Sequence, residues 1–333
     1  MAAGLLLTGI PAAAGPAVTI TELPALPGGT TTQATAINDH GAVVGTSDLP
    51  GGRTHAVKWN SARRITDLGT LPGDADSNAT GIDNSGIVVG CSTAPNGDER
   101  AVKWNSAGKI SALPALHAGD QTVANAVNDN GVIVGYEVIA SQLHALRWKP
   151  NGTVTDLGTL TMFDNGYATA VDAGGVIVGG SFAVDQNGAL GVRWAANGAS
   201  TALPLLPGAF DEDGEADGIN DSGVMVGSSV TTVRAHFDAV RWSAKGVVTD
   251  LGNLPGGSDS SAVGIDDAGV IVGSGLDANG DDEAIRWSAE GTIAALPTLP
   301  GGSSAEALAI NDGGVIVGDA DNSGGQDNAV VWH

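Results

Sequence analysis

The sequence predicts an all-β fold: a seven-bladed β-propeller built from four-stranded blades. Three motifs, each present seven times at a period near 45 residues, support this prediction. The first is a strand-like tetrapeptide that ends in Trp. The second is an Asn/Asp-x-x-Gly turn followed by a β-branched run that ends in Gly, and the third is similar to Asp-Leu-Gly-Thr-Leu-Pro-Gly. The seven Trp mark the period: Trp59, Trp104, Trp148, Trp194, Trp242, Trp287 and Trp332.

Each repeat is interpreted as four short strands in a fixed order. The first strand covers a stretch such as 79–82, and the second is a β-branched run such as 132–135. The third contains the Trp, as in 101–104, and the fourth contains the Asp-Leu-Gly motif, as in 66–71. No segment shows a sustained apolar period of 3.6 residues, so we expect essentially no helix.

The two ends of the chain predict how the ring closes. Residues 18–23 resemble a fourth strand that precedes any first strand, and residues 328–332 form a third strand with no fourth strand after it. We therefore expect the N-terminal strand to complete the last blade, a device that an open solenoid would not need. The chain then divides into an apolar segment that resembles a signal peptide, 1–16, and one propeller domain, 17–333. A single Cys, Cys91, excludes an intramolecular disulfide.

A glycine ends every turn between the first and second strands. The Asn/Asp-x-x-Gly spacing is that of a tight hairpin whose last residue needs positive φ, which glycine adopts without a Cβ clash. We expect substitution of Gly223 to destabilise the fold more than substitution of Gly280, which lies in a longer variable loop. The seven turn glycines are Gly41, Gly86, Gly131, Gly175, Gly223, Gly269 and Gly314.

The three motifs together resemble the HAF repeat family, a family of repeat proteins expected to be extracellular in bacteria. The resemblance covers residues ~18–333, and all three motifs recur in register. The family is named for a His-Ala-Phe element. The nearest copies here are His55-Ala56-Val57 and His144-Ala145-Leu146, and no copy keeps the Phe. The resemblance implies an extracellular address and indicates little about activity.

Composition limits the partners. The chain has 37 Asp and Glu against 14 Lys and Arg, a net charge of −23, which argues against nucleic acids and anionic membrane surfaces. Residues 1–16 combine a short apolar run, a Pro and an Ala-x-Ala pattern, which are typical of a secretion signal, although no basic residue precedes the run. The run is shorter than the ~20 residues of a membrane span. We expect an exported, extracellular monomer without membrane insertion.

The two rims of the predicted propeller differ. One carries short uniform turns, and the other carries variable acidic loops such as 210–215 and 275–283. Variable loops on a rigid scaffold are where binding usually resides. We therefore predict a non-catalytic binding or interaction module that uses the acidic loop face, with an extracellular glycan or protein as ligand. The same loops also fit a simpler interpretation, in which they vary freely and their acids maintain solubility.

An enzyme acting on carbohydrate, either a glycoside hydrolase or a lyase, is the alternative function. It would need paired carboxylates near the channel mouth. The familiar catalytic motifs are absent, including the nucleophile elbow, the His-Glu-x-x-His zinc motif and the phosphate-binding glycine loop. The candidate catalytic acids all lie in the irregular fifth repeat: Asp211, Asp213, Glu215 and Asp217.

Three acidic loops have a ligand pattern that suits Ca²⁺, which takes several oxygen ligands. The same residues are also common in hairpin turns for conformational reasons alone. The candidate Ca²⁺ ligands are Asp319, Asp321, Ser323 and Asp327 in the first loop, Asp277, Asn279 and Asp281 in the second, and Asp74, Asp76 and Asn78 in the third.

The repeated Trp and the bases beside them are interpreted as structural. Core filling between blades explains one Trp per repeat better than a sugar-stacking surface does. The bases point away from the Trp face, where we expect them to pair with turn acids or to cover apolar surface with their stems. These bases are Lys58, Lys103, Arg147, Arg193, Arg241 and Arg286, and the turn acids are Asp39, Asp83, Asp129, Asp172, Asp221, Asp266 and Asp312.

Overall fold

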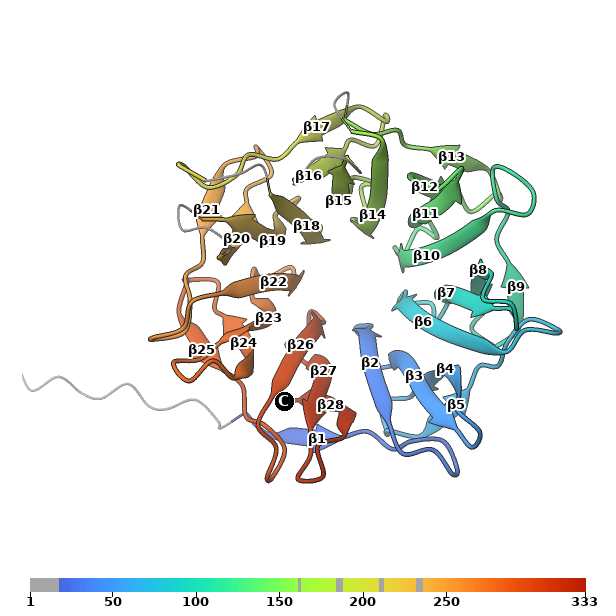
Figure 1. The fold of residues 1–333 in the computed structure, drawn as a ribbon, viewed down its shortest axis with the longest axis horizontal. Helices are drawn as coiled ribbons and strands as arrows, with labels where there is room; N and C mark the ends of the chain where they lie inside the picture. The colour runs from blue at the N-terminus through green and yellow to red at the C-terminus, as the bar shows by residue number, and fades with distance from the viewer. Residues whose placement is uncertain (1–17, 161–162, 184–187, 210–212, 232–235) are drawn as a thin grey trace, which may run out of the picture.

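The computed structural model describes residues 18–160, 163–183, 188–209, 213–231 and 236–333, and the strands in it form a ring (Figure 1). These residues contain 28 strands and no helix. The strands form seven four-stranded antiparallel sheets, which are the blades of a propeller. The predicted fold class is therefore confirmed. None of the described segments is a helix long and apolar enough to cross a membrane.

Each blade runs outward from the central channel, and blades 1 to 7 follow chain order (Figure 1). The innermost strands are β2 (Thr32–Ile37), β6 (Asp76–Ile82), β10 (Gln121–Val127), β14 (Asn165–Val171), β18 (Gly214–Ile219), β22 (Ser260–Ile265) and β26 (Ala305–Ile310). The second strands are β3 (Val43–Leu49), β7 (Val88–Thr93), β11 (Ile133–Ile139), β15 (Ile177–Phe182), β19 (Met225–Val230), β23 (Ile271–Leu276) and β27 (Ile316–Asp321). The third strands are β4 (Arg53–Trp59), β8 (Glu99–Trp104), β12 (Gln142–Trp148), β16 (Ala189–Trp194), β20 (Phe237–Trp242), β24 (Asp282–Trp287) and β28 (Asp327–Trp332). The outermost strands are β5 (Ile65–Asp67), β9 (Ile110–Ala112), β13 (Val154–Asp156), β17 (Ser200–Ala202), β21 (Val248–Asp250), β25 (Ile293–Ala295) and β1 (Ile20–Glu22).

The ring closes through the N-terminal strand, as the sequence predicts. Strand β1 pairs antiparallel with β28, and Ile20 lies opposite Trp332. The pairing continues beyond the strand ends, because the Leu23 amide donates to the carbonyl of Ala329. Blade 7 thus takes three strands from the C-terminus and one from the N-terminus. The segment 1–16 lies outside the described residues.

The outermost strands are shorter than expected. The sequence predicts a fourth strand over 66–71, but β5 ends at Asp67. The Asp67 carboxylate accepts a hydrogen bond from the Gly69 amide at 2.7 Å, and Gly69 has a φ of 67°. A side chain that bonds its own backbone two residues on forms a turn, which removes these residues from the ladder.

A β-bulge interrupts the innermost strand of every blade, and the sequence does not reveal it. In blade 1 the register with β3 shifts between Ala34 and Ala36, which leaves Thr35 outside the ladder. The Thr35 hydroxyl donates to the carbonyl of Ala79 in blade 2 at 2.7 Å. The bulge residue therefore links neighbouring blades. Thr80 and Thr169 make the same link.

The core consists of seven apolar clusters, each lying between two adjacent blades. The cluster between blades 7 and 1, for example, combines Leu23, Trp59 and Val331. All seven Trp side chains are buried, which confirms their interpretation as core residues. Five of the seven indole N–H groups donate to a backbone carbonyl, as Trp59 does to Pro24 at 2.8 Å. These five Trp thus combine apolar burial with a satisfied polar group, whereas the buried indole N–H groups of Trp194 and Trp287 have no hydrogen-bond partner among the described residues.

All seven turn glycines have positive φ, between 72° and 86°, as predicted. The expected contrast with Gly280 is wrong in its reason, because Gly280 also has a φ of 87°. The two positions differ only in the space available for a side chain. A Cβ on Gly223 would lie 3.3 Å from the Cβ of Ala244, whereas a Cβ on Gly280 would meet nothing within 4 Å.

The bases beside the Trp do not pair with the turn acids. No ion pair recorded among the described residues joins the two sets. All six bases are half-buried, which fits the alternative that their stems cover apolar surface. Arg147 instead donates to the carbonyl of Ala196 in blade 4.

Two of the repeated motifs meet through a His–Asp contact. His55 Nδ1 lies 3.0 Å from the Asp67 carboxylate, and His144 Nδ1 lies 3.0 Å from that of Asp156. Both pairs join a third strand to the outermost strand of the same blade. In these two blades the His-Ala element therefore contacts the Asp-Leu-Gly element.

Candidate functional site

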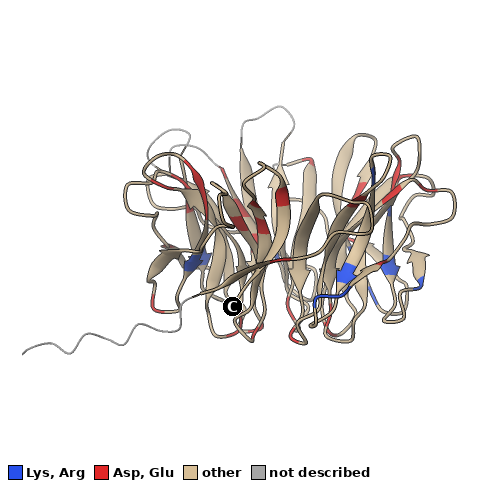
Figure 2. Ribbon diagram, turned by 90° about the horizontal axis from the view of Figure 1, so that it is seen from below, with Lys and Arg blue, Asp and Glu red and all other residues tan. Residues whose placement is uncertain are grey.

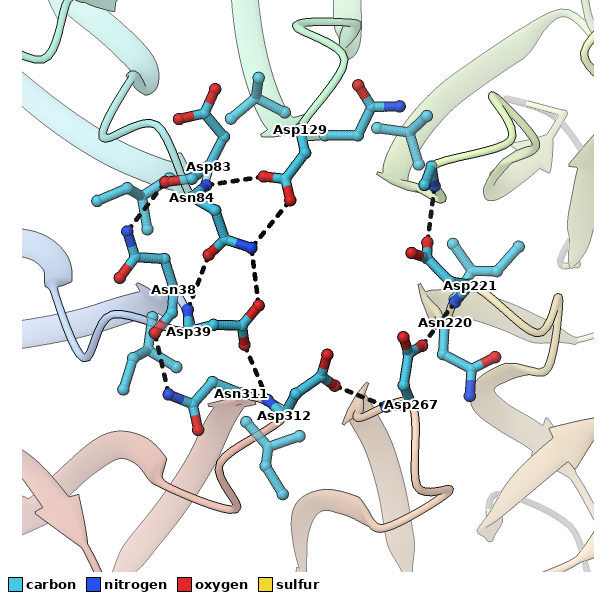
Figure 3. A pocket seen from close by; sticks show the side chains of 18 of the residues that line it. Asn38, Asp39, Asp83, Asn84, Asp129, Asn220, Asp221, Asp267, Asn311 and Asp312 are labelled. Atoms are coloured by element: carbon cyan, nitrogen blue, oxygen red, sulfur yellow. Dashed lines mark hydrogen bonds between the residues drawn. The ribbon is translucent and has the colours of Figure 1, made fainter.

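The acids on the turn rim, which carries the turns between first and second strands, hold the blades together. Figure 3 shows this end of the channel, where a cavity of about 190 Å³ is lined by Asn and Asp side chains. In six of the seven blades, the side chain at the second residue of the Asn/Asp-x-x-Gly turn accepts a hydrogen bond of 2.8–3.0 Å. The donor is the backbone amide at the same position in the preceding blade. Six such bonds run around the ring, and Ala173 breaks it because it offers no acceptor. The six acceptors are Asp39, Asn84, Asp129, Asp221, Asp267 and Asp312.

The opposite rim, which we call the loop rim, contains a larger pocket between blades 5 and 6. This blade 5–6 pocket has a volume of about 590 Å³. Figure 2 shows acids along the loop rim, whereas most Lys and Arg lie in the lower half of that view. Among the described residues, four acids and no base line the pocket. The lining residues are Asp213, Glu215, Ser228, Phe237, Asp259, Ser260, Ser261, Ser274, Gly275, Leu276 and Asp282.

Asp259 is a fixed, ionised carboxylate in this pocket. It accepts hydrogen bonds from the Ser258 hydroxyl at 2.6 Å and from the Phe237 amide at 3.1 Å. His236 Nδ1 lies 2.9 Å from Oδ2, the same oxygen that accepts from Ser258. Burial acts to raise the pKa of Asp259, but these hydrogen bonds to the charged form outweigh it and bring the pKa below its usual value. The pocket therefore keeps a negative charge at neutral pH.

The candidate catalytic acids of blade 5 are only partly brought together. Asp213 and Glu215 both line the pocket, Asp217 occupies the bulge position of β18, and Asp211 lies outside the described residues. Burial, together with the charge of Glu215, raises the pKa of Asp217 to about 7. Burial and the same carboxylate raise the pKa of Tyr167, so this phenol stays protonated and is a poor nucleophile.

Acidic residues also line a second cavity, which extends into blade 7. Asp282 also lines a neighbouring cavity of about 280 Å³, together with Glu306, Asp319 and Asp327. Burial and the charges of Glu306 and Asp327 raise the pKa of Asp319 to about 7, although the Ala34 amide donates to it at 2.9 Å. Carboxylates that raise one another's pKa form a site for positive charge.

The raised pKa of Asp319 predicts that acidification stabilises the fold. Between about pH 4 and pH 7 this carboxyl holds a proton in the folded state and loses it on unfolding, so stability falls as pH rises. We expect the melting temperature of the protein to drop by roughly a few degrees from pH 5 to pH 8, and the drop to shrink in Asp319→Asn. Asp321→Asn is the control, because the pKa of Asp321 is lowered and its titration lies below this range. A pH slope that Asp319→Asn leaves unchanged would contradict the assignment.

The candidate Ca²⁺ ligands take part in turns and ion pairs. Asp321 accepts from the amides of Ser303 and Ser304, and Asp277 accepts from the amides of Asn279 and Asp281. These bonds fit the turn interpretation. In the third loop, Asp74 pairs with Arg100 and Asp76 accepts from the Thr54 amide. Ca²⁺ binding at any of the three loops stays a prediction.

Sequence reasoning missed Phe237, Asp259 and Asp282 as pocket residues. Asp259 lies in the connection between blades, and the other two begin third strands in different repeats. The sequence carries no signal for their meeting, because only the packing of blade 5 against blade 6 brings them together. The acidity of the loop face was the one available indication.

Comparisons with known proteins support the fold alone. No protein-family model matches the chain, and no curated protein matches its sequence. A virginiamycin B lyase from Staphylococcus aureus, solved as a catalytically inactive form with quinupristin, has a TM-score of 0.59 and 14% identity over 95% of this chain and 99% of its own. A puromycin-hydrolyzing peptidase from Mycobacterium tuberculosis has a TM-score of 0.61 and 14% identity over 91% of this chain and 50% of its own. A TolB protein from Agrobacterium tumefaciens has a TM-score of 0.51 and 10% identity over 82% of this chain and 95% of its own.

Proposed function

We propose that this protein is an exported, non-catalytic binding module of the HAF repeat type, which binds a cationic segment of another protein in the blade 5–6 pocket. The observation that carries the proposal is the charge of this pocket. Among the described residues, four carboxylates and no Lys or Arg line it. A ligand with ammonium or guanidinium groups would gain charge-assisted hydrogen bonds there.

The remaining lining residues suit a Lys or Arg side chain. Phe237 and Leu276 offer apolar surface to an aliphatic stem, while Ser228, Ser261 and Ser274 offer hydroxyl groups. Pockets of this kind are mostly pre-formed, and a few polar groups set their specificity. We further propose that the protein acts as a monomer, since Val18 and Val247 are the only large apolar side chains that the described residues leave exposed.

Calorimetric titration with a Lys- and Arg-rich peptide tests the proposal. We expect this peptide to bind, binding to weaken with added salt, and an acidic peptide of equal length not to bind. Glu215→Gln should lower the affinity roughly tenfold, because it removes one charged acceptor from the pocket. Glu290→Gln is the matched control: Glu290 is exposed in the turn between β24 and β25 on the turn rim.

Two outcomes contradict the proposal. One is a neutral glycan that binds in preference to the basic peptide, which would favour a carbohydrate ligand. The other is an equal effect of Glu215→Gln and Glu290→Gln, which would show that the net charge of the chain, rather than the pocket, attracts the peptide.

An enzyme acting on carbohydrate is the second candidate, and one observation favours it. The pKa of Asp217, raised to about 7, would let this carboxyl serve as a general acid beside Glu215. Two of the similar propellers are a lyase and a hydrolyzing peptidase, at 14% identity. Release of reducing ends or unsaturated products from a glycan panel, abolished by Asp217→Asn, would establish this alternative.

A further inference from the structure

Blade 3 departs from the repeat at two positions that meet on the loop rim. Five of the seven repeats have Pro directly after the Leu of the Leu-Pro-Gly motif, but here His117 occupies that place. At the fifth residue of the second-strand run the other repeats have Ser, Gly or Ala, but β11 has Glu137. The Nδ1 atom of His117 lies 3.5 Å from the carboxylate of Glu137.

Comparison with the other repeats explains one part of this change, the hydrogen bonds that Glu137 accepts from the backbone. In blade 1 the Ser47 hydroxyl accepts from the Leu26 amide, and in blade 3 Glu137 accepts from the equivalent Leu116 amide at 2.7 Å. Its other oxygen accepts from the His117 amide at 2.9 Å, a donor that a Pro at this position would lack. Glu137 is therefore held rigidly, with its side chain fully buried.

These hydrogen bonds to the backbone amides require neither the imidazole of His117 nor the nearby carboxylate of Asp120. Residues 117–120 form a turn in which the Asp120 amide donates to the His117 carbonyl, and Gly119 has a φ of 101°. The turn places the Asp120 carboxylate 4.0 Å from His117 Nδ1. One ligand atom from each of His117, Asp120 and Glu137 lies within 4.8 Å of the others.

We propose that these three residues bind one Zn²⁺ ion on the loop rim of blade 3. Zn²⁺ takes imidazole nitrogen and carboxylate oxygen at about 2.0–2.2 Å, which separates neighbouring ligands of a tetrahedron by roughly 3.4 Å. The observed 3.5 Å matches this spacing, and the exposed imidazole needs only a small movement toward Asp120. Three protein ligands leave the fourth position open to water or to a donor atom of a bound partner.

Charge also favours a cation here. A buried carboxylate is costly without a compensating charge, and no Lys or Arg forms a recorded ion pair with Glu137 among the described residues. A protonated His117 is the competing source of that charge. Metal binding predicts that the chain binds Zn²⁺, and simple ion pairing predicts that it does not. This proposed Zn²⁺ site is separate from the blade 5–6 pocket.

Calorimetric titration of the chelator-treated full chain with Zn²⁺ tests the proposal. We expect one Zn²⁺ per chain at micromolar affinity and a rise in melting temperature by mass action, with Ca²⁺ unable to compete. His117→Ala should weaken this binding by roughly 100-fold or more, since even indirect partners of a metal contribute 10–100-fold. Glu137→Ser should do the same, and it keeps an acceptor for the Leu116 amide as in blade 1, so it is expected to fold.

His144→Ala is the matched control, because His144 lies in the same blade and pairs with a single carboxylate, that of Asp156. This variant should bind Zn²⁺ as the wild type does. Absence of Zn²⁺ binding in the wild type would overturn the proposal in favour of an ion pair. Binding that survives both His117→Ala and Glu137→Ser, or that His144→Ala weakens equally, would also overturn it.

Discussion

Replacing Gly90 with Ala should lower the free energy of unfolding by about 3 kcal/mol or more, because no space exists for a Cβ. A Cβ on Gly90 would lie 1.9 Å from the carbonyl oxygen of Asn78 on the adjacent strand β6. That atom belongs to the backbone, so the two innermost strands of blade 2 would have to separate. The bulge in β6 brings this carbonyl over the glycine, which pairs with Ala79 just before the register shift.

All seven blades repeat this contact. The Cβ-to-oxygen distance would lie between 1.8 and 2.0 Å in every blade. The seven glycines end the β-branched runs of the second strands: Gly45, Gly90, Gly135, Gly179, Gly227, Gly273 and Gly318. None of them has positive φ, so steric contact rather than backbone conformation requires glycine here.

Two other glycines of blade 2 provide the comparison. Gly86 ends the turn between first and second strands with a φ of 86°, and Gly97 lies in the next turn with a φ of 92°. A Cβ would lie 3.6 Å from the nearest atom at Gly86 and would meet nothing within 4 Å at Gly97. Ala at either should cost about 1–2 kcal/mol, the penalty of left-handed backbone. Urea denaturation of the three variants gives the order, and Gly90→Ala as stable as Gly97→Ala would show that the Asn78 carbonyl can move away.

These glycines show which features can be predicted from sequence. The strand order, the buried Trp and the positive φ of the turn glycines follow from patterns local to one repeat, and the period follows from the recurrence of these patterns. The Gly at the end of each β-branched run is equally regular, yet its reason is a carbonyl of the preceding strand, displaced by a bulge. Turn propensities contain no information about such a contact.

The candidate sites illustrate a second limit of prediction from the sequence. Asn84 and Asp129 occupy one repeat position, and their roles as acceptors for a neighbouring amide depend on blades about 45 residues apart being side by side. The blade 5–6 pocket and the group around Glu137 arise where individual repeats deviate from the consensus. A repeat alignment within the chain would have identified His117 and Glu137 as deviations, but only the fold brings them into contact.

Deleting residues 1–26 should open the ring and cause aggregation. The deletion removes β1, which leaves one edge of β28 without its partner strand. It also removes Leu23 and Leu26, which are 2% and 6% exposed, and the Pro24 carbonyl that accepts from the indole of Trp59. Two buried Leu contribute about 1.5–3 kcal/mol each, and an unsatisfied indole N–H costs about 1–3 kcal/mol more.

The total loss is similar to the whole stability of a typical domain, about 5–15 kcal/mol, so we expect the shortened chain to unfold or associate through β28. Deletion of residues 1–17 is the matched control, because it keeps β1 and the closing hydrogen bonds between Thr19 and His333. Light scattering after gel filtration and a thermal melt compare the two deletions with the full chain. A chain without residues 1–26 that stays monomeric and keeps its melting temperature would show that three strands of blade 7 suffice to close the ring.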